Sequence, residues 1–180
     1  WVMSDPYFTV KCLNRTEQPQ TLIWQAMHQD YSEECVAHEH PPCESEAGDI
    51  AVKRLLLGGR GHYGPLEHPS IMFSVGWFPH SVMQQARTHR VGVSFDVQSM
   101  RYTGQRVAQV ARGKVDLEEV FYLRPVGDYS DRQGKRYTYT SDQREIDLQH
   151  VSVATCRYAE LIQKGFAEEH ARGLLPFDFR

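Results

Sequence analysis

Arginine side chains gather in one short part of the chain, residues 84–106. This stretch holds four arginines, one histidine and one carboxylate, a formal charge of +3, whereas the whole chain carries −3. A guanidinium group is a planar fork of N–H donors that matches phosphate and carboxylate groups. Because the positive charge is local and the chain as a whole is mildly acidic, the pattern favours a small anionic ligand over nucleic acid, which usually selects a basic domain.

The spacing within this stretch suggests how the donors are held. Gln84 and Arg87 are three residues apart on a predicted helix and share a face, and a turn at Ser99 and Met100 would add backbone donors. The alternative is a solvated basic surface paired with distant carboxylates. The apolar residues between the charges favour a loop that packs on the protein over one that is solvated. These residues are Val91, Val93, Phe95, Val97 and Met100.

Histidines mark two other segments. Residues 61–70 contain His62 and His68, and a histidine before a strand can contact a ligand, although a loop histidine is more often structural or exposed. His38, His40 and Cys43 are donors of the types that bind zinc, but no second ligand pair has matching spacing, so we predict no metal.

Two motifs of nucleotide and thiol chemistry are missing from the sequence. The glycine-rich residues 58–61 lack the Lys-Ser/Thr ending of a phosphate loop. None of the four cysteines has the basic neighbours that lower a thiol pKa, and we expect Cys156 on the buried side of a helix.

Length and composition indicate one globular domain. The chain has 180 residues with 41% hydrophobic and 24% charged side chains, enough to bury a core. No apolar run approaches the roughly 20 residues of a membrane helix, and the amino terminus does not resemble a signal peptide. Four cysteines without a CxxC pair favour reduced thiols, so we expect a cytoplasmic protein without a membrane partner.

Hydrophobic periodicity predicts helices and strands without a regular βαβ alternation. We therefore expect an α+β fold, with a central antiparallel or mixed sheet flanked by helices. Gly58-Gly59 is expected to end the second helix. The predicted helices begin near residues 19, 48, 80 and 145, and a further short helix ends at 172. The predicted strands are 71–77, 107–110 and 119–123. The predicted loops are 33–47 and 89–99, with a loop or hairpin at 127–143.

Three motifs together resemble the flavin-dependent thymidylate synthases. Arg87-Thr88-His89-Arg90, eight residues, then Ser99-x-Arg101-Tyr102 is similar to the family signature Arg-His-Arg, seven or eight residues, then Ser-x-Arg, with Thr88 inserted. Glu67-His68 before the alternating strand is also similar, and so is Ala171-Arg172 before Leu175-Pro176. The resemblance runs from about Leu22 to Pro176.

This resemblance implies an activity. Members of the family make dTMP from dUMP, with methylenetetrahydrofolate as carbon donor and NADPH as reductant through FAD. They are homotetramers whose active sites are shared between subunits. They use no cysteine nucleophile and rely on electrostatic activation and hydride chemistry at the flavin.

The resemblance also assigns residues to roles. The catalytic group is Arg87, His89, Arg90 and Ser99. The residues expected to bind dUMP are Gln84, Arg87, Gln98, Ser99, Met100, Arg101 and Arg172, and those expected to bind FAD are His68, Ser70, Arg87, His89, Arg90 and Asp96.

The chain departs from the family pattern in two places. Many members have an acidic residue two positions before the serine, where this chain has Val97, and Asp96 is the nearest carboxylate. The family usually continues past Leu-Pro with an Asn-x-Arg-Ser-Leu segment, whereas this sequence stops at Arg180. We therefore expect residues 1–180 to be a single domain of this type that is incomplete at its C-terminus.

Two other functions stay open at this point. A non-catalytic nucleotide- or RNA-binding module would use the arginine loop with Tyr102, Tyr137 and Tyr139 as stacking surfaces. A metal-dependent hydrolase would use His38, His40 and His62.

Overall fold

The computed structural model describes residues 7–57 and 61–180, in two compact units. The smaller unit is Val10–Ser74, and the larger one comprises Val75–Arg180 with the residues up to Thr9. The predicted helix end at Gly58-Gly59 lies outside the described residues. The prediction of a single domain stays a prediction, because a division by contacts does not show whether either unit folds alone.

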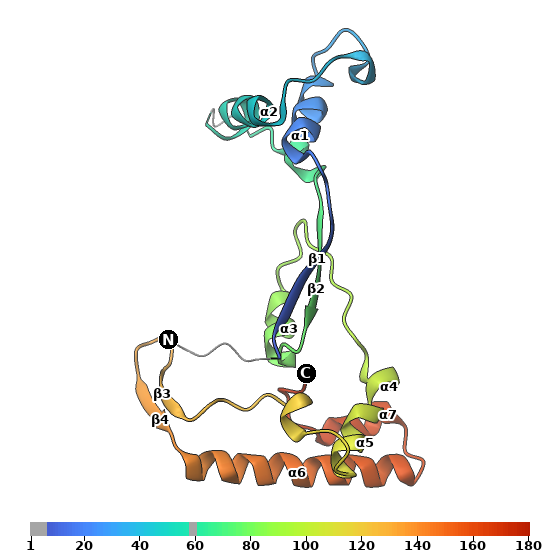
Figure 1. Cartoon of the computed structure of the whole chain (residues 1–180), viewed down its shortest axis with the longest axis vertical. Helices are drawn as coiled ribbons and strands as arrows, with labels where there is room; N and C mark the ends of the chain where they lie inside the picture. Colours follow the sequence, from blue (N-terminus) through green and yellow to red (C-terminus); the bar gives the residue numbers. More distant parts are fainter. Residues whose placement is uncertain (1–6, 58–60) are drawn as a thin grey trace. The chain divides into compact units, whose positions relative to one another are not determined.

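The smaller unit is a helical pair with its own small core. Helices α1 (Pro19–His28) and α2 (Glu44–Ala51) pack on each other (Figure 1). A π-helical turn, η2 (Val52–Leu56), continues α2, and 3₁₀ turns η1 (Val36–His38) and η3 (Gly64–Glu67) lie in the connections. The buried core residues of this pair are Met27, Ala51 and Leu55.

Helix α1 is capped by a side chain from the other helix. The Glu44 carboxylate accepts hydrogen bonds from the backbone N–H groups of Gln20 and Thr21, both at 2.9 Å, and from the Thr21 hydroxyl at 2.8 Å. Desolvation raises the pKa of Glu44, but these three hydrogen bonds outweigh it, so the pKa is lowered. The predicted start of this helix near Pro19 is confirmed.

Strands β1 (Thr9–Arg15) and β2 (Ile71–Gly76) form a two-stranded sheet. The alternation at residues 71–77 predicted β2 correctly, although both faces of the strand are largely exposed. Ile71 and Phe73 are 57% and 50% exposed.

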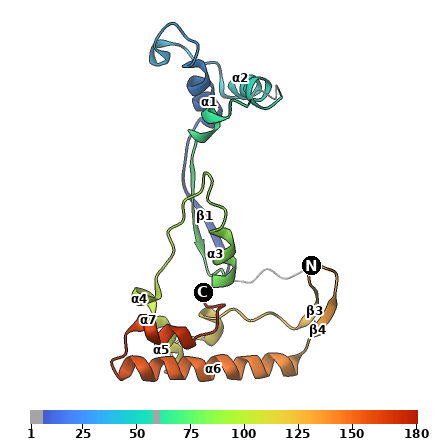
Figure 2. The ribbon, with the colours of Figure 1, turned by 180° about the vertical axis from the view of Figure 1, so that it is seen from behind.

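The larger unit is organised around the long helix α6 (Ser141–Gln163). Helices α5 (Gln105–Ala111) and α7 (Glu168–Ala171) pack against it, and the two views of the ribbon show both beside α6 (Figures 1 and 2). The same unit includes α3 (His80–Ala86), α4 (Met100–Thr103), and the 3₁₀ turns η4 (Leu117–Glu119) and η5 (Arg172–Leu174). Its buried core residues are Met100, Val107, Val120, Phe121, Val151, Tyr158, Leu161 and Ala171.

A hairpin leads into α6. Strands β3 (Gly127–Ser130) and β4 (Arg136–Tyr139) pair antiparallel, with Tyr129 opposite Tyr137, in the segment predicted as a loop or hairpin. Thr140 then begins α6 with a capping box, in which its side chain and that of Gln143 each bond the other residue's backbone N–H.

Two predicted strands are wrong. Residues 107–110 belong to helix α5, because Val107 and Ala108 are buried against α6 and this packing overrides the β-propensity of valine. Residues 119–123 begin in the η4 turn and pair only through the single bridge between Phe121 and Phe179.

The α+β class is confirmed, since helices combine with strands in the described residues, but the strands there form two separate two-stranded sheets and not the expected central sheet. No helix in that part of the chain has the length and apolar character needed to cross a membrane.

Candidate functional site

Local hydrogen bonds hold the first half of the arginine motif. The chain leaves α3 in a tight turn in which Arg87 N–H donates to Met83 O at 3.0 Å and His89 N–H donates to Ala86 O at 3.0 Å. Thr88 adds a hydrogen bond from its hydroxyl to Gln85 O at 2.7 Å. The residue inserted into the motif therefore stabilises the turn that presents Arg87 and His89.

The side chains on this turn are exposed. Arg87, His89 and Arg90 all face solvent. Within residues 7–57 and 61–180, the guanidinium groups of Arg87 and Arg90 make no hydrogen bond or ion pair. Their donors are thus available to an anion.

The segment after this turn is irregular, as predicted, but its first part does not pack. Val91 is 98% exposed and Val93 is 49% exposed, whereas Met100 at the far end is 5% exposed. The prediction that the apolar residues pack the whole loop is wrong within this chain, because only Met100 reaches the helical core. Asp96, expected at FAD, is exposed on this segment.

The second half of the motif is held by α4. The main-chain oxygen of Ser99 accepts hydrogen bonds from Tyr102 N–H at 2.9 Å and Thr103 N–H at 3.2 Å. The Arg101 Nε donates to the Ser99 hydroxyl at 3.5 Å, a long contact, and its guanidinium lies 5.7 Å from the centre of the Tyr102 ring. Because Met100 is buried between them, Ser99 and Arg101 stay at the surface of a fixed turn.

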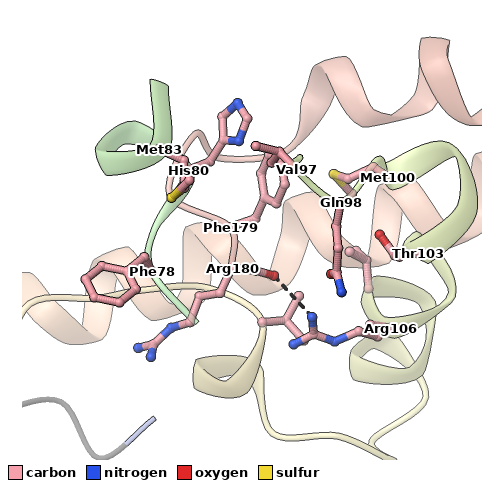
Figure 3. Close-up of a pocket in the computed structure, with 12 residues that line it drawn as sticks. Phe78, His80, Met83, Val97, Gln98, Met100, Thr103, Arg106, Phe179 and Arg180 are labelled. Carbon is pink, nitrogen blue, oxygen red and sulfur yellow. Dashed lines mark hydrogen bonds between the residues drawn. The ribbon is translucent and has the colours of Figure 1, made fainter. Parts of the chain in front are cut away.

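Arg106 has a different environment from the other three arginines. Its Nη2 donates to Glu119 O at 3.0 Å and its Nη1 to the main-chain oxygen of Arg180 at 3.3 Å, a bond drawn in Figure 3. The guanidinium also lies 5.8 Å from the centre of the Trp77 ring. Trp77 has a φ of 60°, a left-handed conformation that is rare for an aromatic residue. Arg106 is therefore a structural residue of this unit.

A small cavity lies beside this network. Figure 3 shows it with Gln98 and Met100, both expected at dUMP, among the residues that line it. Its volume is about 70 Å³, well below the roughly 300 Å³ of the smaller ligand sites. A nucleotide therefore needs more surface than this cavity offers.

His80 is a residue of this region that the sequence analysis missed. It lines the cavity, and its ring stacks on Phe179 with 4.7 Å between centroids. Burial lowers the pKa of His80, and the charges of Arg87 and Arg172 lower it further, while Asp178 raises it.

The charges of Arg87, Arg172 and Asp178 thus all act on the His80 ring. The His80 Nε2 also lies 2.8 Å from the amide nitrogen of Gln84. Of the residues expected at dUMP, the structure brings Gln84 into direct contact with this ring. The sequence did contain a signal for His80. It precedes Gln84 by four residues and Arg87 by seven, a spacing that places all three on one helix face.

His68 and Ser70, the other residues expected at FAD, belong to the smaller unit. His68 directly follows η3 and is exposed. The Ser70 backbone N–H donates to the Thr16 hydroxyl at 3.0 Å, and Thr16 N–H donates to Ser70 O at 2.9 Å. Nearby, His62 Nε2 pairs with Asp30 Oδ2 at 2.6 Å.

The residues considered for metal binding are not gathered into a cluster. The described part of the chain holds no group of three or more His, Cys, Asp or Glu side chains that could bind a metal. All four cysteines are free and exposed, including Cys156, whose predicted burial is wrong. The pKa of the Cys43 thiol is lowered, chiefly by the hydrogen bond with the Ser45 hydroxyl, and not by basic neighbours.

The tyrosines considered as stacking surfaces differ in their contacts. Tyr102 is 81% exposed. Tyr137 stacks on Tyr129 at 5.8 Å and accepts a hydrogen bond from Arg124, and the Tyr139 hydroxyl donates to Asp147 at 2.6 Å. Two of the three rings are therefore engaged within the hairpin and its junction with α6.

Comparisons with known proteins agree with the motif. Residues 11–180 match the family model of the thymidylate synthase complementing protein. The chain is 36% identical over 180 residues to a flavin-dependent thymidylate synthase of Halobacterium salinarum and 33% identical over 186 residues to one of Haloarcula marismortui. Each alignment covers 93% of this chain and 72% of the relative.

Solved structures give the same fold. A UMP/dUMP methylase, PolB from Streptomyces cacaoi, bound with 5-Br dUMP, superposes with a TM-score of 0.64 at 22% identity. The superposition covers 95% of this chain and 69% of that one.

Proposed function

The chain belongs to the family of flavin-dependent thymidylate synthases, and we propose on this basis that it converts dUMP into dTMP. Methylenetetrahydrofolate is the proposed carbon donor, and NADPH the proposed reductant through FAD. The observation that carries the proposal is the 36% identity over 93% of the chain to a relative of that name. The exposed donors of Arg87 and Arg90 support it, because every ligand of the reaction is an anion.

The proposed dUMP site uses side chains of the larger unit. Gln84 contacts His80, the charges of Arg87 and Arg172 act on the same ring, and Arg101 and Ser99 lie on the turn that begins α4. We assign Arg101 and Arg172 to the nucleotide charge, since a guanidinium binds phosphate through two parallel N–H bonds. A fixed positive charge near the pyrimidine stabilises negative charge that develops on the ring, which serves in place of a cysteine nucleophile. Gln98 and Met100 complete this proposed set.

The proposed FAD site rests on the chemistry of its donors. Arg87, His89 and Arg90 are exposed on one turn, and the guanidinium donors of both arginines are not used by other described residues, which fits the pyrophosphate of a flavin dinucleotide. When bound, FAD would supply the redox step that turns a methylene group into a methyl group. The remaining residues of the proposed site are Asp96, His68 and Ser70.

We further propose that the active protein is a homotetramer with shared sites. The cavity beside His80 is too small for a nucleotide, and Val91 and Val93 are exposed on the motif segment, as residues that contact another subunit would be. Four free cysteines support a reducing, cytoplasmic setting.

A visible absorption spectrum tests the function. The purified chain is measured alone, with FAD and then with dUMP. We expect a bound-flavin spectrum that changes when dUMP is added, because both ligands would share one site. Flavin binding with no response to dUMP, combined with no dTMP formation from folate and NADPH, would contradict the proposal.

Two matched variants test the assignment of roles. Arg90→Ala is expected to weaken flavin retention, and Arg101→Ala is expected to weaken mainly dUMP binding. The loss of one charge-assisted hydrogen bond predicts a change of about tenfold or more in each case. Equal effects of both variants on both ligands would show that the roles are wrongly divided.

A further inference from the structure

Helix α4 is too short to fix its own position. It is a single turn, Met100–Thr103, and isolated helices of this length are not stable in water. Ser99 is the residue before the turn and Gly104 the one after it. Met100 and Gly104 are buried, whereas Arg101 is exposed. The surface that carries Ser99 and Arg101 is therefore placed by whatever packs against Met100 and Gly104.

The phenol end of Tyr158, which projects from α6, lies against this turn. Tyr158 is completely buried and belongs to the same core cluster as Met100. A Cβ on Gly104 would collide with the Tyr158 hydroxyl oxygen and would lie 3.3 Å from the ring atom Cζ. Since only a glycine lets the main chain approach the hydroxyl this closely, α4 rests on the phenol end at Gly104.

The stability of this chain does not explain the hydroxyl group of Tyr158. The oxygen is buried and has no hydrogen-bond partner in the described residues. An unpaired buried hydroxyl destabilises a protein, and a phenylalanine would fill the same space without one. Burial and then the charge of Glu168, the first residue of α7, raise the pKa of Tyr158, so the group beside Gly104 is a neutral hydroxyl. What the hydroxyl adds is one more atom between the ring and α4.

We propose that Tyr158 is a positioning residue of the nucleotide site, whose hydroxyl oxygen sets how far α4 stands from α6. Because the oxygen is buried, it acts through the main chain of α4 and not through a contact with the ligand. It thereby holds Ser99 and Arg101 where they meet the nucleotide, and a displacement of about 1 Å can remove much of the effect of a binding group. The inference rests on the proposed function in one respect, namely that Ser99 and Arg101 bind dUMP.

The test variant is Tyr158→Phe, which removes the oxygen and keeps the ring. We would measure the dissociation constant for dUMP by calorimetry on the full chain with FAD, and the denaturant unfolding of the same samples. The affinity for dUMP is expected to fall by about tenfold, the effect of weakening one charge-assisted hydrogen bond, while the unfolding midpoint stays nearly unchanged. A residue with a purely structural role would lower the midpoint and leave the affinity of the folded chain as it was.

Tyr139→Phe is the matched control, because it removes a phenol oxygen of the same unit outside the proposed site. It is expected to leave the affinity for dUMP unchanged. Gly104→Ala disturbs the same contact from its other side, since the added methyl group would push α4 away from Tyr158. Its affinity for dUMP is also expected to fall. The double variant with Tyr158→Phe is expected to recover most of the affinity, because the methyl group takes the place of the missing oxygen.

The outcomes separate the inference from the function on which it rests. If the unmodified chain binds dUMP and Tyr158→Phe binds it equally well, the hydroxyl does not place α4 and the inference is overturned. An equal loss of affinity in Tyr139→Phe, or no recovery in the double variant, would also overturn it. If the unmodified chain does not bind dUMP, the proposed function itself fails, and the inference fails with it.

Discussion

Two parts of the larger unit differ in what holds them. The helices α5, α6 and α7 share a core in which Phe121 and Tyr158 are almost completely buried. The segment between α3 and α4 carries most of the proposed site, yet Val91 in its middle is 98% exposed. The segment is fixed only at its two ends, by the turn after α3 and by the burial of Met100. In this chain the core therefore holds the proposed site at its ends, and Val91 and Val93 in the middle of the motif stay exposed.

The largest expected effect tests the core side of this comparison. Phe121→Ala removes an almost fully buried ring and should lower the free energy of unfolding by about 3–5 kcal/mol. Val91→Ala in the motif segment should change it by less than about 0.5 kcal/mol. Denaturant unfolding of both variants measures the contrast, and similar losses would remove the distinction between the two regions.

A second prediction concerns the place where the core meets the end of the motif. A Cβ on Gly104 would lie 2.1 Å from the Tyr158 hydroxyl oxygen and 2.9 Å from Met100 O. Gly104→Ala is therefore expected to destabilise the chain by about 1–3 kcal/mol, against the usual helix preference for alanine.

The Tyr158 hydroxyl supplies the control for this prediction. It is buried and has no hydrogen-bond partner in the described residues, so Tyr158→Phe should cost little. Combined with Gly104→Ala, it should restore part of the lost stability, and thermal unfolding compares the three variants. If the stability changes of the two single substitutions simply add in the double variant, the clash is not with the hydroxyl.

The third prediction separates arginines of the same stretch. Arg106→Met leaves Glu119 O and the main-chain oxygen of Arg180 without their donor and should destabilise the chain by about 1–3 kcal/mol. Arg90→Met, on the exposed turn, should stay within about 0.5 kcal/mol. Equal losses of unfolding free energy would mean that Arg90 is structural as well.

The smallest effect belongs to the junction of the hairpin with α6, outside both regions. Burial and then the hydrogen bond to Asp147 raise the pKa of Tyr139 to about 12. Because the folded-state pKa lies above the unfolded value of about 10, this stabilisation is complete below pH 10 and is lost as the pH rises toward 12. Ultraviolet titration of the phenol, with Tyr139→Phe as the reference, should show one tyrosine that ionises late.

The sequence predicted the elements whose signals are local. The proline at the start of α1, the alternation in β2 and the periodicity of α6 all lie within single segments, and each prediction was confirmed. The strand predicted at residues 107–110 was wrong, because valine favours strands and only the contact with α6 makes this segment helical.

The site shows the same limit. The spacing of arginine, histidine and serine identified the motif, because the residues of a family signature lie close in sequence. The contacts that hold His80 and Arg106 are made with Phe179 and Arg180, which are far away in sequence, so the spacing of neighbouring residues does not reveal those contacts.

The bonds of Arg106 also bear on the order in which the unit folds. One guanidinium joins α5 to a residue 13 positions away and to another 74 positions away. Closing a long loop costs more chain entropy than closing a short one, so contacts of this kind form late on the folding pathway. We expect Arg106→Met to leave the refolding rate almost unchanged and to accelerate unfolding, because bonds that form after the transition state for folding mainly slow the unfolding of the native unit.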